Sequence, residues 1–210
     1  MNILVDKKKS TKEIAVSNGA NGKIYLPKLY VNGCEKSMIR LTKLSKALKN
    51  VGYTAWIKKN HHDYILSDHF ILKTNQDIKG SALTKLISLL GTVPNEDQGI
   101  QNRHNHINEM TEDEINRWLD LLKGKDAKSI YFTNLIHQTD KELFSIFKGE
   151  KDYIFLNKIY VDLIDLYEEN IEIRGTKGVS PTYFYKDDEE LMILPVRLRE
   201  EPFYLKGDDK

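Results

Sequence analysis

Histidine and aspartate side chains gather in the stretch HHDYILSDH, residues 61–69. Imidazole and carboxylate groups are common ligands of catalytic metal ions, and a site needs three or four of them around one ion. His61, His62 and His69 are therefore weak candidates for metal binding, and a metal-dependent nuclease is the chemistry they would serve. Neighbours on a strand point to opposite faces, which counts against a joint role for Asp68 and His69. Ordinary turn and surface histidines are the expected alternative.

Three other short motifs lack the partners that their chemistry requires. RHNHINE, residues 103–109, contains the letters H-N-H but sits in a polar stretch with no ββα pattern around it. HQT, residues 137–139, supplies one His-x-Thr motif where two-histidine phosphoesterases need two, and Cys34 has no activating neighbour. Glycine-rich phosphate loops and Ser-His-Asp arrangements are absent from the sequence. A binding protein is favoured over an enzyme, and we predict no catalytic residue and no cofactor.

Basic side chains are concentrated near the N-terminus. Residues 1–60 hold 13 Lys/Arg and 3 Asp/Glu, whereas the remaining residues hold 19 and 28. Such asymmetry indicates a surface that faces a polyanion, although a lysine-rich face that only keeps the protein in solution has the same pattern. Basic residues interleaved with aromatic ones are typical of nucleic-acid binding. The candidate DNA-binding residues are Arg40, Lys43, Lys46, Lys49, Lys58 and Lys59.

Composition sets the broad class. The chain has 210 residues, of which 40% are hydrophobic and 30% charged, as in ordinary globular proteins. Its one cysteine excludes an internal disulfide and a zinc site built from paired cysteines. No apolar run approaches the ~20 residues that cross a bilayer, and MNILVDKKK has the reverse order of a signal peptide. We expect a cytoplasmic protein without membrane partners.

Hydrophobic periodicity predicts an α+β protein with mixed antiparallel sheets and packed helices. Helices are expected at 41–51, at 81–90 and from 111 to 123, where Thr111 and Glu114 form a capping box. A hairpin is expected over 53–74 with its turn at 58–63. We predict a flexible segment at 1–22, a basic α+β domain at 23–92, a polar linker at 93–110 and a second α+β domain at 111–210.

The most regular pattern begins at Tyr153. DYIFLN reads as a strand, 158–169 as an acidic helix, and IEIRG, PTYFYKD and ELMILPVRL as three strands in succession. Proline lacks a backbone donor, so pairing of the last strand should stop at Pro195. The expected order is strand, helix and three strands.

This unit, residues 153–198, resembles the C-terminal βαβββ repeat of bacterial DNA sliding clamps, the beta subunit of DNA polymerase III. The resemblance lies in FLNKIYVDLIDLY, ENIEI and the ending MILPVRL. In that family the closing strand helps to form a hydrophobic pocket for short linear motifs of polymerases and repair proteins. The resemblance thereby implies a partner-binding site at Met192, Leu194, Pro195, Val196, Arg197 and Leu198. Tail residues 199–205 could instead cover this site.

Three functions are consistent with these observations. The first is a non-enzymatic accessory protein that binds DNA or a replication complex and originates from a phage or plasmid. The second is a mobile-element inhibitor or interaction protein that targets a host defence or replication factor. The third and weakest is the metal-dependent nuclease. The expected partners are DNA, a DNA-processing or host protein, and further copies of the chain in a homo-oligomer.

Overall fold

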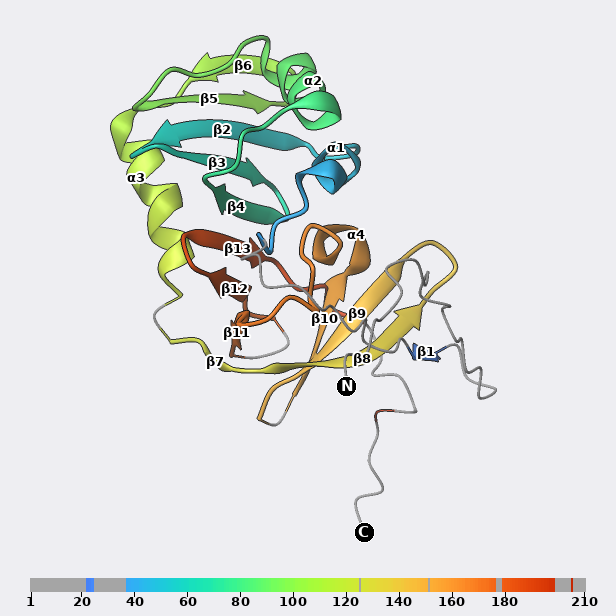
Figure 1. Ribbon diagram of the computed structural model, residues 1–210. Helices are drawn as coiled ribbons and strands as arrows, with labels where there is room; N and C mark the ends of the chain where they lie inside the picture. Colours follow the sequence, from blue (N-terminus) through green and yellow to red (C-terminus); the bar gives the residue numbers. More distant parts are fainter. Residues whose placement is uncertain are drawn as a thin grey trace, which may run out of the picture.

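The computed structural model describes residues 22–24, 37–124, 126–150, 152–176, 179–198 and 205. Nearly all of the predicted flexible segment 1–22, together with Cys34, lies outside these residues. Among the described residues, no helix is long and apolar enough to cross a membrane. The predicted α+β class is confirmed, with mixed antiparallel sheets and a few packed helices (Figure 1).

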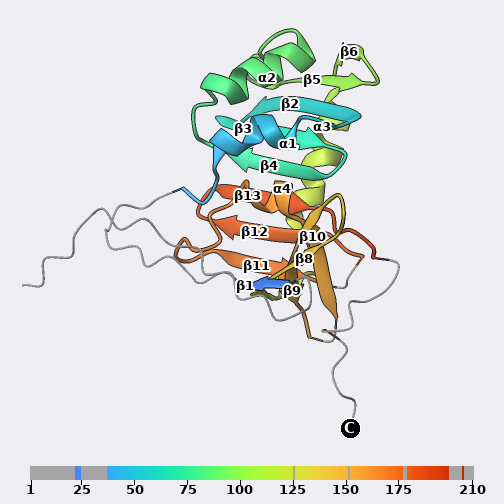
Figure 2. The same cartoon turned by 90° about the vertical axis from the view of Figure 1, so that its right-hand side faces the viewer.

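A nine-stranded antiparallel sheet forms the body of the protein, in the order β6-β5-β2-β3-β4-β13-β12-β11-β7. Figure 2 shows most of these strands stacked one above the other. Each pairing in it is antiparallel. Five pairings join consecutive strands, and three join strands that are distant in sequence: β2 with β5, β7 with β11, and β4 with β13. Its strands are β2 (Tyr53–Lys59), β3 (His62–Ser67), β4 (Phe70–Thr74), β5 (Gln98–Arg103), β6 (His106–Glu109), β7 (Lys128–Ser129), β11 (Glu172–Gly175), β12 (Thr182–Lys186) and β13 (Glu189–Ile193).

A four-stranded sheet packs beside the long one, in the order β1-β8-β9-β10. Its strands are β1 (Gly22–Ile24), β8 (Tyr131–Gln138), β9 (Leu143–Lys148) and β10 (Tyr153–Asn157). Phe147 and Ile154 of this sheet share one apolar core with Phe184 and Leu191 of the long sheet. The two sheets therefore bury each other.

Short helices cover the long sheet on both faces. The helical elements are η1 (Leu41–Lys43), α1 (Leu44–Ala47), α2 (Gly80–Leu90), α3 (Glu112–Asp120), η2 (Leu121–Lys123) and α4 (Lys158–Val161). α1, α2 and α4 pack on the face that carries Trp56 and Leu72, while α3 and η2 pack on the face that carries Ile57 and Met192. The predicted capping box forms, because Thr111 accepts from the Glu114 N–H and the Glu114 carboxylate accepts from the Thr111 N–H.

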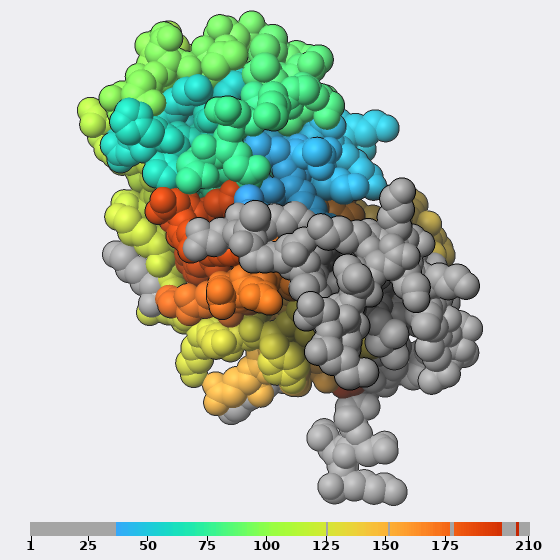
Figure 3. Space-filling view, viewed as in Figure 1, coloured from blue at the N-terminus to red at the C-terminus, as the bar shows by residue number. Residues whose placement is uncertain are grey.

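The predicted order of strand, helix and three strands is confirmed by β10-α4-β11-β12-β13. A second unit of the same order precedes it: β1, the helical turn η1–α1, then β2, β3 and β4. The units join edge to edge where β4 pairs with β13, and α1 lies against α4. In Figure 3 the red residues of β13 form the seam between the cyan–green half and the orange–yellow half.

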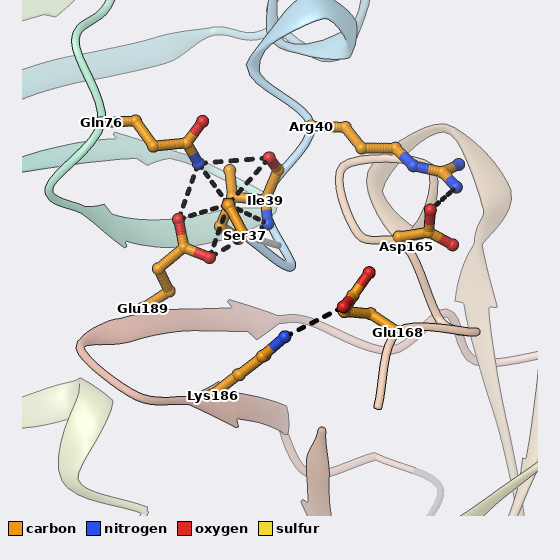
Figure 4. A network of polar contacts seen from close by, with 8 residues as sticks. All are labelled: Ser37, Ile39, Arg40, Gln76, Asp165, Glu168, Lys186 and Glu189. Atoms are coloured by element: carbon orange, nitrogen blue, oxygen red, sulfur yellow. Dashed lines mark hydrogen bonds and ion pairs between the residues drawn. The ribbon is translucent and has the colours of Figure 1, made fainter. Parts of the chain in front are cut away.

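A buried polar network fixes the chain where the two units meet (Figure 4). The carboxylate of Glu189, 5% exposed, accepts hydrogen bonds from Ser37, Thr74, Gln76 and the Ile39 N–H, at 2.6 to 3.2 Å. A buried carboxylate is tolerated only when donors surround it, and these donors come from two separate segments, 37–39 and 74–76. Two ion pairs lie nearby. Arg40 pairs with Asp165 at 2.5 Å, and Lys186 of β12 pairs with Glu168 at 3.2 Å, so the chain after α4 is attached to both units.

Two predicted helices are shorter than the sequence indicates. The 41–51 helix ends within two turns, at Ala47, because Leu44, Ala47 and Leu48 already complete its buried face. The 158–169 helix stops at Val161. Beyond it, Ile164 forms a β-bridge with Ile39, and the Leu163 carbonyl accepts the Arg40 N–H at 2.7 Å. Long-range backbone pairing therefore replaces the helical turns.

Two predicted connections are also different. The hairpin at 53–74 is three strands rather than two: Asn60 and His61, both with positive φ, make the first turn, and Asp68 and His69 make the second. The polar stretch 93–110, predicted as a linker, contains β5 and β6. β6 is exposed at every position, so it lacks the apolar alternation that would reveal a strand in sequence.

Replacing Leu72 by Ala tests the joint between the two units. Leu72 is fully buried and pairs with Ile65 on one side and Leu191 on the other. The cavity should lower the free energy of unfolding by about 2–5 kcal/mol in urea denaturation. Val179→Ala is the control, because Val179 is 64% exposed and its loss should cost less than about 0.5 kcal/mol. Equal effects of the two variants would contradict the proposed joint.

Candidate partner-binding groove

A groove of about 1020 Å³ opens beside α1 and α4. Five segments form it: the end of α1, the β3–β4 turn, the β8–β9 turn, α4 with the preceding Asn157, and the chain that follows β13. We call it the α1–α4 groove. It is lined by Lys46, Ala47, Lys49, Asn50, His69, Lys141, Glu142, Leu143, Asn157, Lys158, Ile159, Tyr160, Asp162, Leu194, Pro195 and Val196.

The chain after β13 is held in place by two backbone hydrogen bonds. The Leu194 N–H donates to the His69 carbonyl at 2.9 Å, and the Val196 N–H donates to the Phe155 carbonyl at 2.8 Å. Pro195 lies between them and has no N–H to donate. The chain thus leaves the long sheet after Ile193 and crosses to β10, which leaves the Leu194 side chain 40% exposed on the groove.

Apolar side chains and lysines meet in this groove. Leu143 and Leu194 are exposed apolar residues, and Ile159 and Tyr160 lie half-buried between them. Three exposed lysines, Lys46, Lys49 and Lys141, also line it and make no ion pair with any described residue.

The remaining charged residues of the groove are engaged locally. Lys158 forms an ion pair with Asp162, one turn along α4. The carboxylate of Glu142 accepts from the Asn157 amide at 2.9 Å. The groove therefore keeps an excess of positive charge.

Tyr160 links the groove to the β3–β4 turn. Its ring stacks on His69 with centroids 4.9 Å apart and contacts Phe70. Burial, with the nearby carboxylates of Asp68 and Glu142, raises the pKa of Tyr160 to about 12. The phenol thus remains neutral and adds a polar edge to an otherwise apolar surface.

The six predicted partner-binding residues are divided between four places. Leu194, Pro195 and Val196 line the groove, whereas Met192, 4% exposed, points to the opposite face of the sheet and packs under η2 and α3. Arg197 is exposed outside the groove. Leu198 and part of Val196 pack with Phe144, Ile146, Phe155 and the tail residue Leu205. Leu205 therefore belongs to the cluster around Leu198, a cluster that does not include Leu194.

The predicted DNA-binding residues also separate. Lys43, Lys46 and Lys49 are exposed on the η1–α1 stretch, while Arg40 pairs with Asp165. Lys58 and Lys59 lie at the far end of β2, away from α1 (Figure 1).

Lys58 and Lys59 have contacts of their own at that end. Lys58 is 3.8 Å from Asp63 and lies over the Trp56 ring, and Lys59 donates to Asn116 of α3. The structure brings only Lys46 and Lys49 of the predicted set into the groove.

The histidine-rich stretch is distributed along β3. His61 and His62 lie at the β2–β3 turn, where His62 Nδ1 contacts the Asn60 carbonyl, and His69 lies beyond the other end of the strand. Asp63 accepts from the Trp56 indole at 2.6 Å, and burial raises the pKa of its carboxyl. Among the described residues, no three His, Cys, Asp or Glu side chains are grouped so that they could hold a metal ion.

Lys141, Leu143, Ile159 and Tyr160 were not identified by sequence reasoning. Lys141 and Leu143 border the β8–β9 turn, in a polar stretch without a motif. Ile159 and Tyr160 belong to a predicted amphipathic helix, where apolar residues ordinarily mark the core. Their position beside Leu194 follows from the folding of β10 and β13 against each other. No pattern in the neighbouring sequence predicts this position.

The ionisation of Tyr160 can be followed through stability at high pH. A phenol whose pKa is raised from 10.0 to about 12 stabilises the fold below pH 10, and this contribution is lost as the pH rises toward 12. The wild-type chain should therefore lose more stability than Tyr160→Phe over this range, measured by urea unfolding. Tyr131, 61% exposed, gives the control: Tyr131→Phe should follow the wild type. Parallel curves for wild type and Tyr160→Phe would refute the burial of this phenol.

Comparison with known proteins gives a likeness to sliding clamps. A putative DNA polymerase III beta subunit from Eubacterium rectale ATCC 33656 is similar over 88% of this chain and 76% of its own, with 12% identity and a TM-score of 0.32. The DNA polymerase III beta subunit of Thermotoga maritima is similar over 78% of this chain and 63% of its own, with 16% identity and a TM-score of 0.37. No protein-family model and no curated protein matches the sequence. Both structures belong to the family that residues 153–198 resemble in sequence.

Proposed function

We propose that this protein is a non-enzymatic, clamp-like accessory of DNA replication complexes that binds a short segment of a partner protein in the α1–α4 groove. One observation carries the proposal. Leu194, Pro195 and Val196, at which the sequence resemblance implies partner binding, lie on an open groove with apolar walls.

The form of the groove suits a linear segment. Its volume is at the upper end of the ~300–1,000 Å³ that is common for ligand pockets. Leu194 and Leu143 each remain about two-fifths exposed, and burying such side chains under a partner's apolar residues is the main favourable term in peptide binding. Rigid attachment of residues 194 and 196 to the two sheets lowers the entropic cost of that binding.

A second proposal, DNA binding, is supported by the η1–α1 stretch. Lys43, Lys46 and Lys49 are exposed there and have no ion-pair partner among the described residues. Lysines at this spacing can contact successive phosphates. Origin in a phage or plasmid, a cytoplasmic location and homo-oligomer formation accompany the proposal of an accessory protein. A mobile-element inhibitor of a host defence or replication factor is the alternative proposal.

Site-specific photo-crosslinking tests the partner-binding groove. Leu194 is replaced by p-benzoylphenylalanine in the organism that carries the protein, and crosslinked proteins are identified by mass spectrometry. Proteins of DNA replication or repair should be captured from Leu194. Val179, which is 64% exposed against 40% for Leu194 and does not line the groove, is the control and should not capture them. Identical captures at both positions, or none at Leu194, would reject the groove as the binding site.

Fluorescence anisotropy with labelled single- and double-stranded DNA tests the second proposal. Binding should weaken about 10-fold or more between about 50 mM and about 200 mM salt, because each lysine–phosphate contact releases counterions. Lys43/Lys46/Lys49→Glu should abolish it. Lys79/Lys123/Lys128→Glu carries the same charge change elsewhere and should bind as the wild type does. Absence of salt-dependent binding would remove DNA as a direct partner.

A further inference from the structure

We infer that the α1–α4 groove selects partner segments in which acidic side chains flank the apolar anchors, with Lys46, Lys49 and Lys141 as the residues that read the acidic positions. This inference rests on the proposed function and goes beyond it. It assigns specificity to two lysines of the first unit and to Lys141 of the β8–β9 turn, whereas the implied partner-binding residues all lie after β12.

The charge balance of the groove is the first argument. Its lining holds four lysines and two carboxylates. Lys158 and Asp162 neutralise each other, and Glu142 is bound by the Asn157 amide. No described carboxylate pairs with the three remaining lysines. A partner that supplies carboxylates would therefore complete ion pairs without breaking any that exist.

The placement of these lysines is the second argument. Lys46 lies in the last turn of α1 and Lys49 just beyond its end, where the Lys49 N–H donates to the Lys46 carbonyl at 3.2 Å, and both line the groove. Lys141 lies on another wall, in the β8–β9 turn. Apolar Leu143, Leu194 and Ile159 line the space with them. Coulomb attraction is stronger beside an apolar surface than in open water, so an acidic residue next to a buried anchor gains more here than on a free surface.

A nucleic acid strand fits the same groove less well. Asp162 and Glu142 both line it, and a backbone with a charge at every nucleotide would approach them as well as the lysines. A peptide can place its carboxylates at the lysines only and present apolar or neutral groups to Asp162 and Glu142. Basic segments would be rejected by the lysines, which is how a shallow groove gains specificity.

Peptide selection on the intact chain tests the inference. A phage-displayed library of random heptapeptides is panned over the wild-type chain and over Leu194→Asp. Sequences that the wild type recovers and Leu194→Asp does not should be enriched in Asp or Glu next to Leu, Ile or Phe. The enriched sequences are synthesised with a fluorescent label, together with amide versions in which each Asp is Asn and each Glu is Gln.

The affinities of these peptides for variants of the chain then show which lysines bind the acidic side chains. Lys46→Glu/Lys49→Glu should bind the acidic peptide roughly tenfold or more weakly than the wild type does. The wild type should bind the amide peptide more weakly than the acidic peptide by a similar factor. The affinity of the amide peptide should be nearly the same for the wild type and for the double variant. Lys79→Glu/Lys85→Glu is the matched control, since it makes the same charge change at two lysines that do not line the groove, and it should change affinity less than about threefold. Thermal unfolding of each variant confirms that it is folded.

The outcomes separate this inference from the proposed function. Peptides that require Leu194 but show no acidic preference, or that tolerate Lys46→Glu/Lys49→Glu, would overturn the inference and leave the groove as a peptide site. Recovery of no Leu194-dependent peptide would overturn both. Displacement of the acidic peptide by oligo(dT), with Lys43→Glu as damaging as the double variant, would assign the lysines to nucleic acid and overturn the inference as well.

Discussion

The antiparallel pairing of β4 with β13 is the contact on which the rest of the structure depends. It runs from Glu190 opposite Lys73 to Ile193 opposite Phe70, and it joins segments about 120 residues apart into one nine-stranded sheet. Without it, each βαβββ unit would expose the unpaired edge of its sheet and the apolar side chains that the other unit now covers. The same pairing places Leu194 beside His69. Their backbones form a hydrogen bond, and both residues line the groove. The stability of the sheet and the shape of the groove therefore depend on the same contact.

The polar side chains on the two sides of the helix pair α1–α4 differ in whether they have partners within the chain. On one side Glu189 is enclosed by donors from Ser37, Thr74 and Gln76, and the ion pair between Arg40 and Asp165 closes the surface. The Glu189 carboxylate is satisfied within the chain, so it has little left to offer a ligand. On the other side Lys46, Lys49 and Lys141 have no acidic partner among the described residues, and Leu143 and Leu194 remain exposed. Exposed apolar area with polar groups at its rim is typical of interaction sites, which is why we propose this side as the binding surface.

Some features of the site could be predicted from sequence and others could not. The ending MILPVRL indicated where strand pairing stops, and Leu194, Pro195 and Val196 do line the groove. The spacing of Lys46 and Lys49 indicated an exposed basic face, which the structure has. Met192 was assigned to the same site but faces the other core, because side chains alternate along β13 and its position faces the core under α3 and η2. Lys141 had no sequence signal, since only the folding of β9 onto β10 brings its turn to the groove.

The sequence by itself determined the local structure. The capping box at Thr111, the amphipathic stripe of α2 and the strands β10 to β13 follow from interactions between residues close in the chain. The tertiary structure alone decided where two helices end, that 93–110 forms β5 and β6, and that α1 and the chain after β13 share a groove. In each of these cases the deciding contact spans many residues, such as Ile39 with Ile164 or β4 with β13. Hydrophobic periodicity reports which face of a segment is buried but not which distant segment buries it, and that choice is made only when the whole core assembles.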